Sequence, residues 1–173
     1  MAVSRLQIYS DPLQHALLAA AVAAPLVPRA GWGVLAAAVV PALVIDLDHA
    51  VAARSVRIAD TTALATRPRS HSLVTAAGTG AVIATAAGPL HGWAAFGGLV
   101  SHLLHDAGDR AAPTPMLWPF APARQLGRRR QLAGTLALVL ASAAISRAAA
   151  AASRRPSAAA ADGAGGTARP RTA

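Results

Sequence analysis

Histidine and aspartate side chains that could bind a metal recur near the ends of the apolar segments of this chain. His102 and Asp106 stand four positions apart in an otherwise apolar run. On a helix, this spacing places both side chains on one face, about one turn apart. An imidazole and a carboxylate in that arrangement can bind one divalent cation. Ionisable groups at the end of a membrane helix are costly and usually functional, which favours this interpretation.

Residues of the same types stand at the ends of three other apolar segments. Asp46, Asp48 and His49 follow the second segment. His15 and His71 stand near the starts of the first and the third. If the segments run alternately up and down, all of these groups lie at the same end of the bundle. Residues with unrelated structural roles would instead be distributed over both ends. The pattern therefore predicts a shared metal site, with ligands drawn from His15, Asp48, His49, His71, His102 and Asp106.

The composition narrows the kind of metal. Cysteine is absent and every acidic residue is an aspartate, so the ligands must be imidazole, carboxylate, water or backbone oxygen. This donor set suits Zn²⁺, with Mn²⁺ or Fe²⁺ as alternatives. His105 lies about 100° around the helix from Asp106 and is a weaker ligand candidate. His91, at the opposite end of its segment, is expected to be an interfacial residue.

The elements that would carry these residues are hydrophobic. Of the 173 residues, 54% are hydrophobic and 13% are charged, and the mean hydropathy is +0.44. These values fit a multi-pass membrane protein better than the alternative, a soluble helical bundle with an alanine-rich core. The net charge of +9 comes from arginines that flank apolar stretches. We attribute this charge to membrane topology and expect no nucleic-acid partner.

The pattern predicts an all-α fold, a multi-pass membrane helical bundle with four to five transmembrane helices. The apolar segments cover residues 13–28, 32–47, 71–88, 91–107 and 131–146. Several are shorter than the roughly 20 residues of a spanning helix, which snorkelling arginines or a thinner bilayer can accommodate. Residues 1–150 would form the membrane domain. Residues 151–173, rich in Ala, Gly, Pro and Arg, would form a disordered tail.

Four sequence pieces occur in a recognisable order: His15, Asp46-Leu47-Asp48-His49, Ser70-His71-Ser72-Leu73, and His102-Leu103-Leu104-His105-Asp106 followed by Leu117-Trp118-Pro119-Phe120. Together they resemble the YdjM-type family of membrane-bound metal-dependent hydrolases, over about residues 15–122. Two positions depart from the family pattern. Thr66 replaces the first His of its His-Arg-x-x-Thr-His-Ser motif, and Asp109 stands where the family has a Thr.

A more distant similarity supports the same chemistry. The His-x-x-x-Asp spacing is similar to that of zinc-dependent phospholipase C and P1 nuclease, which are helical phosphodiesterases with several zinc ions. Their later His-x-x-x-Glu pair has no counterpart in this glutamate-free chain, which favours one or two metals.

The resemblance implies a hydrolase in which a metal-activated water attacks a phosphoester or lipid-like substrate. Asp46, expected to lie near the metal without binding it, is the expected general base, and Asp48 is a second catalytic carboxylate. Arg67 or Arg69 would bind an anionic substrate. The alternatives are a metal-binding membrane protein without catalysis, such as a transporter or sensor, and a family member with a structural role. A transporter would need charged residues along a path through the bilayer. Charged residues are absent from the middle of the apolar segments, which disfavours a transporter.

The arginines also predict an orientation. The connections at the end that carries the candidate site hold most of them: Arg54, Arg57, Arg67, Arg69, Arg110, Arg124 and Arg128 to Arg130. The opposite connections hold Arg29. Because positive residues in short loops stay in the cytoplasm, we expect a bacterial inner-membrane protein, in contact with the lipid bilayer, whose site faces the cytoplasm. A re-entrant helix at 131–146 is the alternative to a fifth span.

Overall fold

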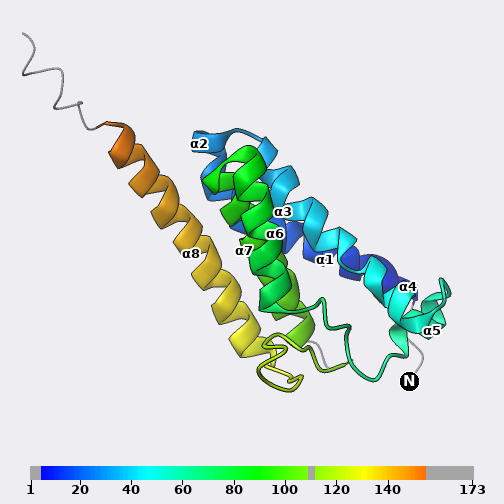
Figure 1. Ribbon diagram of the computed structural model, residues 1–173. Helices are drawn as coiled ribbons and strands as arrows, with labels where there is room; N and C mark the ends of the chain where they lie inside the picture. The colour runs from blue at the N-terminus through cyan, green and yellow to red at the C-terminus, as the bar shows by residue number, and fades with distance from the viewer. Residues whose placement is uncertain (1–4, 109–111, 155–173) are drawn as a thin grey trace, which may run out of the picture.

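The computed structural model describes residues 5–108 and 112–154, and this part of the chain is helical (Figure 1). Helix α1 (Arg5–Ala23) continues through a 3-10 turn, η1 (Ala24–Leu26), into α2 (Val27–Ala30). Helices α3 (Gly33–Val44) and α4 (Leu47–Ala53) follow, then the short α5 (Ile58–Thr62). The long helices α6 (Leu73–Ala87), α7 (Pro89–Gly108) and α8 (Arg128–Ser153) complete the bundle.

Each of the five apolar segments is helical over most of its length, but two helices extend well beyond the predicted bounds. Helix α1 begins at Arg5 rather than at residue 13, and α8 runs from Arg128 to Ser153 rather than from 131 to 146. Hydropathy marks only the apolar part of a helix, whereas the backbone hydrogen bonds continue through polar residues. The predicted tail therefore loses residues 151–153 to α8, and residues 155–173 lie outside the described part, as does Asp109.

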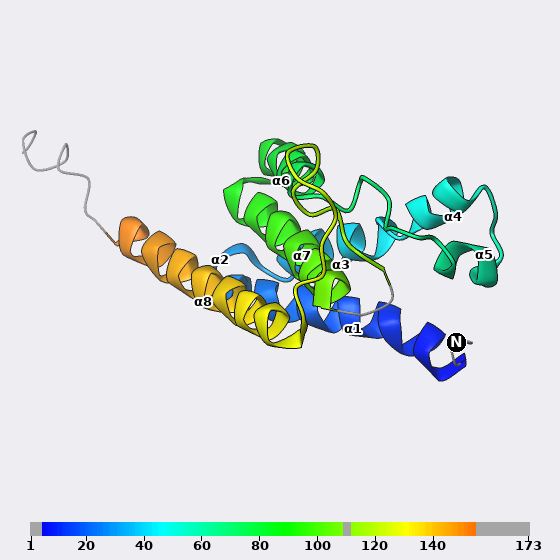
Figure 2. The ribbon, with the colours of Figure 1, turned by 90° about the horizontal axis from the view of Figure 1, so that it is seen from below.

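Helix α7 forms the centre of the bundle. It packs against α1, α3, α6 and α8, and the two views agree that these four helices surround it (Figures 1 and 2). Most of its residues from Gly92 to Ala107 are buried. The residue with the greatest chemical interest on this helix, His102, is fully buried. A ligand on α7 is thus within reach of side chains from several neighbouring helices.

Glycines on α7 allow its neighbours to approach closely. A Cβ atom on Gly98 would lie 2.5 Å from the carbonyl oxygen of Ala38 in α3. A Cβ atom on Gly92 would lie 2.6 Å from the carbonyl oxygen of Gly80 in α6. Small residues at such crossings are typical of membrane helices, which gain van der Waals contact by close backbone approach.

The outer surface of the bundle is apolar. Leu13 and Leu17 on α1, Val40 on α3 and Leu136 and Leu140 on α8 are each more than half exposed. In water such a surface would be costly, but in a bilayer it faces lipid. Within the described residues, three helical stretches are long and apolar enough to span a membrane: Asp11–Ala30, Gly33–Ala53 and Arg128–Ser153. The prediction of an all-α membrane bundle is confirmed.

The chain direction brings particular helix ends together. Helix α3 descends to a break at Ile45 and Asp46, α6 starts at Leu73, and α7 descends to Gly108. Gly88, with a φ of +94°, reverses the chain between α6 and α7. The N-terminal half of α1 and the start of α8 lie at the same end (Figure 1). The alternation expected from the sequence is therefore present.

Candidate metal centre

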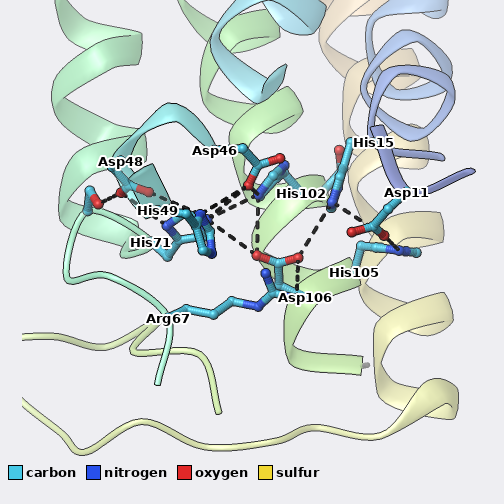
Figure 3. Close-up of polar contacts among 12 residues, drawn as sticks. Asp11, His15, Asp46, Asp48, His49, Arg67, His71, His102, His105 and Asp106 are labelled. Atoms are coloured by element: carbon cyan, nitrogen blue, oxygen red, sulfur yellow. Dashed lines mark hydrogen bonds and ion pairs between the residues drawn. The ribbon is translucent and has the colours of Figure 1, made fainter. Parts of the chain in front are cut away.

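Three donor atoms from three parts of the chain form an equilateral triangle (Figure 3). Asp46 Oδ1 lies 3.4 Å from His71 Nε2 and 3.4 Å from His102 Nε2. The two imidazole nitrogens lie 3.4 Å from each other. Tetrahedral zinc sites have metal–nitrogen distances of about 2.0–2.1 Å, which correspond to donor separations of about 3.3–3.4 Å. The triangle therefore has the size of one face of such a site.

Local structure explains why these three side chains meet. His102 projects from the buried centre of α7. Asp46 stands at the break between α3 and α4, as the residue preceding α4. His71 lies in the loop before α6, where its backbone N–H donates to Pro68 at 3.0 Å and the N–H of Leu73 donates to Met116 at 2.8 Å. The two loops at this end of the bundle thus fix the His71 ring against α7.

Asp106 lies one turn below His102 and presents its two oxygens to different neighbours. Oδ2 lies 3.3 Å from His102 Nε2 and 3.5 Å from His71 Nε2. Oδ1 lies 3.1 Å from Arg67 Nη2 and 3.5 Å from His15 Nε2. The Asp106 side chain is fully buried. Buried charges are tolerated only when paired, so this carboxylate depends on the cationic groups around it.

Asp48 supports the opposite edge of the His71 ring. Its Oδ2 lies 3.4 Å from His71 Nδ1, and the Ser70 hydroxyl donates to the same oxygen. Its Oδ1 lies 3.2 Å from His49 Nδ1. Burial lowers the pKa of His71, but the nearby carboxylates of Asp46 and Asp48 outweigh burial and raise this pKa above its ordinary value. A carboxylate on Nδ1 leaves Nε2 to face the triangle.

Asp11, His15 and His105 lie on the other side of Asp106 (Figure 3). Asp11 Oδ1 lies 3.2 Å from His105 Nε2 and 3.8 Å from His15 Nε2. The His15 ring stacks on the His102 ring with centroids 3.8 Å apart. Helix α1 therefore contributes two polar residues next to the triangle.

The donor set suits a metal. Four groups of three residues place one ligand atom each within 4.8 Å of the others: Asp11, His15 and His105; His15, His102 and Asp106; Asp46, His71 and His102; Asp48, His49 and His71. Both ring nitrogens of His15 and Nδ1 of His102 are buried without a hydrogen-bond partner among the described residues. Unsatisfied buried polar atoms are rare in folded proteins, and such atoms often serve as ligands to an ion.

All six residues predicted as ligands belong to this cluster, together with Asp46. The two arginines expected to bind substrate are placed differently. Arg67 contacts Asp106 inside the cluster, whereas the guanidinium of Arg69 lies 5.8 Å from the centre of the Trp118 ring. Arg69 thus packs on a loop aromatic ring. His91 is remote from the cluster, where its Nε2 packs against Gly33.

The sequence pattern does not identify Asp11 as a candidate ligand, and it ranks His105 as a weaker one. Asp11 precedes the first apolar segment, but α1 already includes it. A signal is present in the sequence, because Asp11 and His15 have the same four-residue spacing as His102 and Asp106. The weak rating of His105 rests only on its angle to Asp106 on one helix. Its actual neighbours come from α1 and α8, which a single-helix projection does not include.

Comparison with known proteins identifies one family. The sequence model of one family, described as YdjM inner membrane protein, matches residues 11–164. The matched region includes every residue of the cluster. No curated protein and no solved structure matches the chain. From the extent of the family match, this chain belongs to the YdjM inner membrane protein family.

Proposed function

We propose that this protein is a membrane-bound hydrolase that uses a divalent metal ion, most simply zinc, to cleave a phosphoester. Asp46, His71 and His102 are the proposed ligands. The observation that carries the proposal is the triangle of donor atoms with sides of 3.4 Å. Three protein ligands that leave one position open are typical of catalytic rather than structural zinc. Manganese and iron suit the same donors.

The surrounding residues have separate roles in this proposal. Asp46 would hold the ion together with His71 and His102, and its second carboxylate oxygen would accept a proton as the general base. Asp48 is a positioning residue, because it contacts His71 Nδ1 and the neighbouring His49. Asp106 completes the negative charge of the cluster on the side of α7. We assign no metal contact to His49, which touches Asp48 and stacks edge-on against the His71 ring.

A divalent ion held by these residues would lower the pKa of a coordinated water towards about 7 and so supply a nucleophile. Arg67 is the proposed substrate-binding residue. Its guanidinium is already next to Asp106, and arginine binds phosphate oxygens through paired N–H donors. Arg69, which packs on the Trp118 ring, would attract an anionic substrate electrostatically without binding it directly. A lipid phosphoester is the preferred class, because the site lies at one end of a bundle whose sides face lipid.

The experiment is hydrolysis of a chromogenic phosphodiester by purified protein in detergent, after metal removal and reloading with zinc, manganese or iron. We expect activity that depends on the metal and is lost in His102→Ala. His91→Ala, at the opposite end of the bundle, is the matched control and should keep activity. Arg67→Gln should raise KM more than it lowers kcat. Metal binding without hydrolysis of phosphoesters or lipids would instead favour a transporter or sensor.

A further inference from the structure

Asp106 has the geometry of a residue that joins two sites. Its Oδ2 faces His71 and His102 at 3.5 and 3.3 Å, and its Oδ1 faces His15 at 3.5 Å. Oδ1 also forms an ion pair with Arg67 Nη2 at 3.1 Å, and a carboxylate oxygen with two lone pairs can face both groups at the same time. Carboxylates that present one oxygen to each of two ions are a feature of two-metal hydrolases.

The donors beyond Oδ1 form a cluster that the function proposed above does not use. Asp11 Oδ1 lies 3.2 Å from His105 Nε2, and His15 Nε2 lies 3.8 Å from the same oxygen. The three residues place their donor atoms within 4.8 Å of one another. His15 is 1% exposed and His105 is 7% exposed. Asp11 is more open, with its side chain 43% exposed, so an ion could enter from that side.

The missing hydrogen-bond partners of the His15 ring independently indicate that a ligand binds there. Neither Nδ1 nor Nε2 of this buried ring has a hydrogen-bond partner among the described residues. Burying such a ring without a hydrogen-bond partner lowers the stability of the fold unless a ligand compensates it. The ring stands between Asp11 and Asp106, so a cation bound to Nε2 would be close to two carboxylates. A cation bound to His15 Nε2 would give this nitrogen a partner and would balance the negative charge of the two carboxylates.

Helix α8 orients the third residue of this cluster, His105. The amide of Gln131 lies 3.0 Å from His105 Nδ1, so Nε2 is the nitrogen that faces Asp11. Gln131 is itself buried and fits because α7 has no Cβ at Gly108, where one would lie 2.5 Å from Gln131 Oε1. Hydrogen bonds to the distal nitrogen orient ligand histidines in this way.

We propose that Asp11, His15 and His105 form a second site for a divalent transition-metal ion, joined to the first site by Asp106. The joining by Asp106 rests on the function proposed above, whereas the second site stands on its own donors. Imidazole and carboxylate ligands select zinc, manganese or iron rather than calcium or magnesium. Gln131 acts as a positioning residue that holds His105 towards Asp11.

The test is a manganese titration of metal-free, detergent-purified protein, followed by metal analysis and electron paramagnetic resonance. Wild type should bind two ions per chain with a spin-coupled spectrum. Asp11→Asn and His105→Gln, which keep side-chain size, should bind one ion with an uncoupled spectrum. Asp60→Asn is the matched control, because Asp60 is exposed and lies outside the cluster, and it should behave as wild type.

The variants also separate the two sites. His71→Ala should lose the first ion and keep the ion at Asp11, His15 and His105. One ion in wild type, unchanged in Asp11→Asn and His105→Gln but lost in His71→Ala, would overturn the second site while leaving the first intact. Asp11 and His105 would then form only a hydrogen-bonded pair. A wild type that binds no manganese and no zinc would overturn both proposals.

Discussion

At the scale of single residues, Asp48 offers a test of how the His71 ring is held. Asp48 contacts Nδ1 of His71 and not the nitrogen in the triangle. Loss of such a supporting carboxylate typically weakens metal affinity about 10–100-fold. Asp48→Asn should therefore lower zinc affinity by about this factor while leaving the number of bound ions at saturation unchanged. Competition with a chromogenic chelator measures the affinity, and Asp60→Asn is the control. Loss of the ion even at saturating zinc would make Asp48 a ligand instead.

The raised pKa of His71 also predicts how metal stabilisation depends on pH. In metal-free protein, a histidine whose pKa is raised contributes stability that is complete below its unfolded value of 6.5 and is lost as pH rises through the folded value. Metal binding requires the neutral ring, so protons compete with the ion. The increase in melting temperature on adding zinc should therefore be larger at pH 8 than at pH 6. An equal increase at both values, or a larger one at pH 6, would contradict this.

At the scale of elements, the close contact of α3 with α7 holds Asp46 next to His102. Gly98→Ala would place a Cβ atom 2.5 Å from the Ala38 carbonyl oxygen, so the two backbones must separate. We expect a lower melting temperature together with weaker zinc binding. Gly78→Ala on α6 is the matched control, because its Cβ would meet nothing within 4 Å and alanine favours the helix by up to about 1 kcal/mol. Equal melting temperatures and zinc affinities for the two variants would contradict the role of this contact.

The elements also show what the sequence could and could not predict. Hydropathy located every long helix, and the alternating order of segments was enough to bring His15, Asp46, His71 and His102 to one end. Helix ends were less accurate because polar residues such as Asp11 extend α1 without changing the apolar pattern. The division of roles between Asp46 and Asp48 depends on which ring nitrogen each one contacts. The orientation of the His71 ring depends on the conformation of its loop, which the spacing of residues in the sequence does not predict.

At the scale of the whole molecule, the arginines predict which end faces the cytoplasm. Most of the arginines in the described connections lie at the end that carries the cluster, whereas Arg29 lies at the other. The chain has no cysteine, so single cysteines can be placed at Ala59 and Gln125 near the cluster and at Ala87 at the far end. An impermeant thiol reagent on intact cells should label only Ala87→Cys. Labelling of Ala59→Cys and Gln125→Cys without Ala87→Cys would reverse the orientation.

The metal content of the purified protein tests the central claim most directly. Wild type, His102→Ala and His91→Ala should be purified in detergent from cells grown with added zinc and measured by mass spectrometry of the elements. His102 belongs to the triangle of donors, whereas His91 packs against Gly33 at the far end. We expect wild type and His91→Ala to carry at least one zinc per chain and His102→Ala to lose it. Metal-free wild type, or equal zinc in all three proteins, would contradict a metal centre at this cluster.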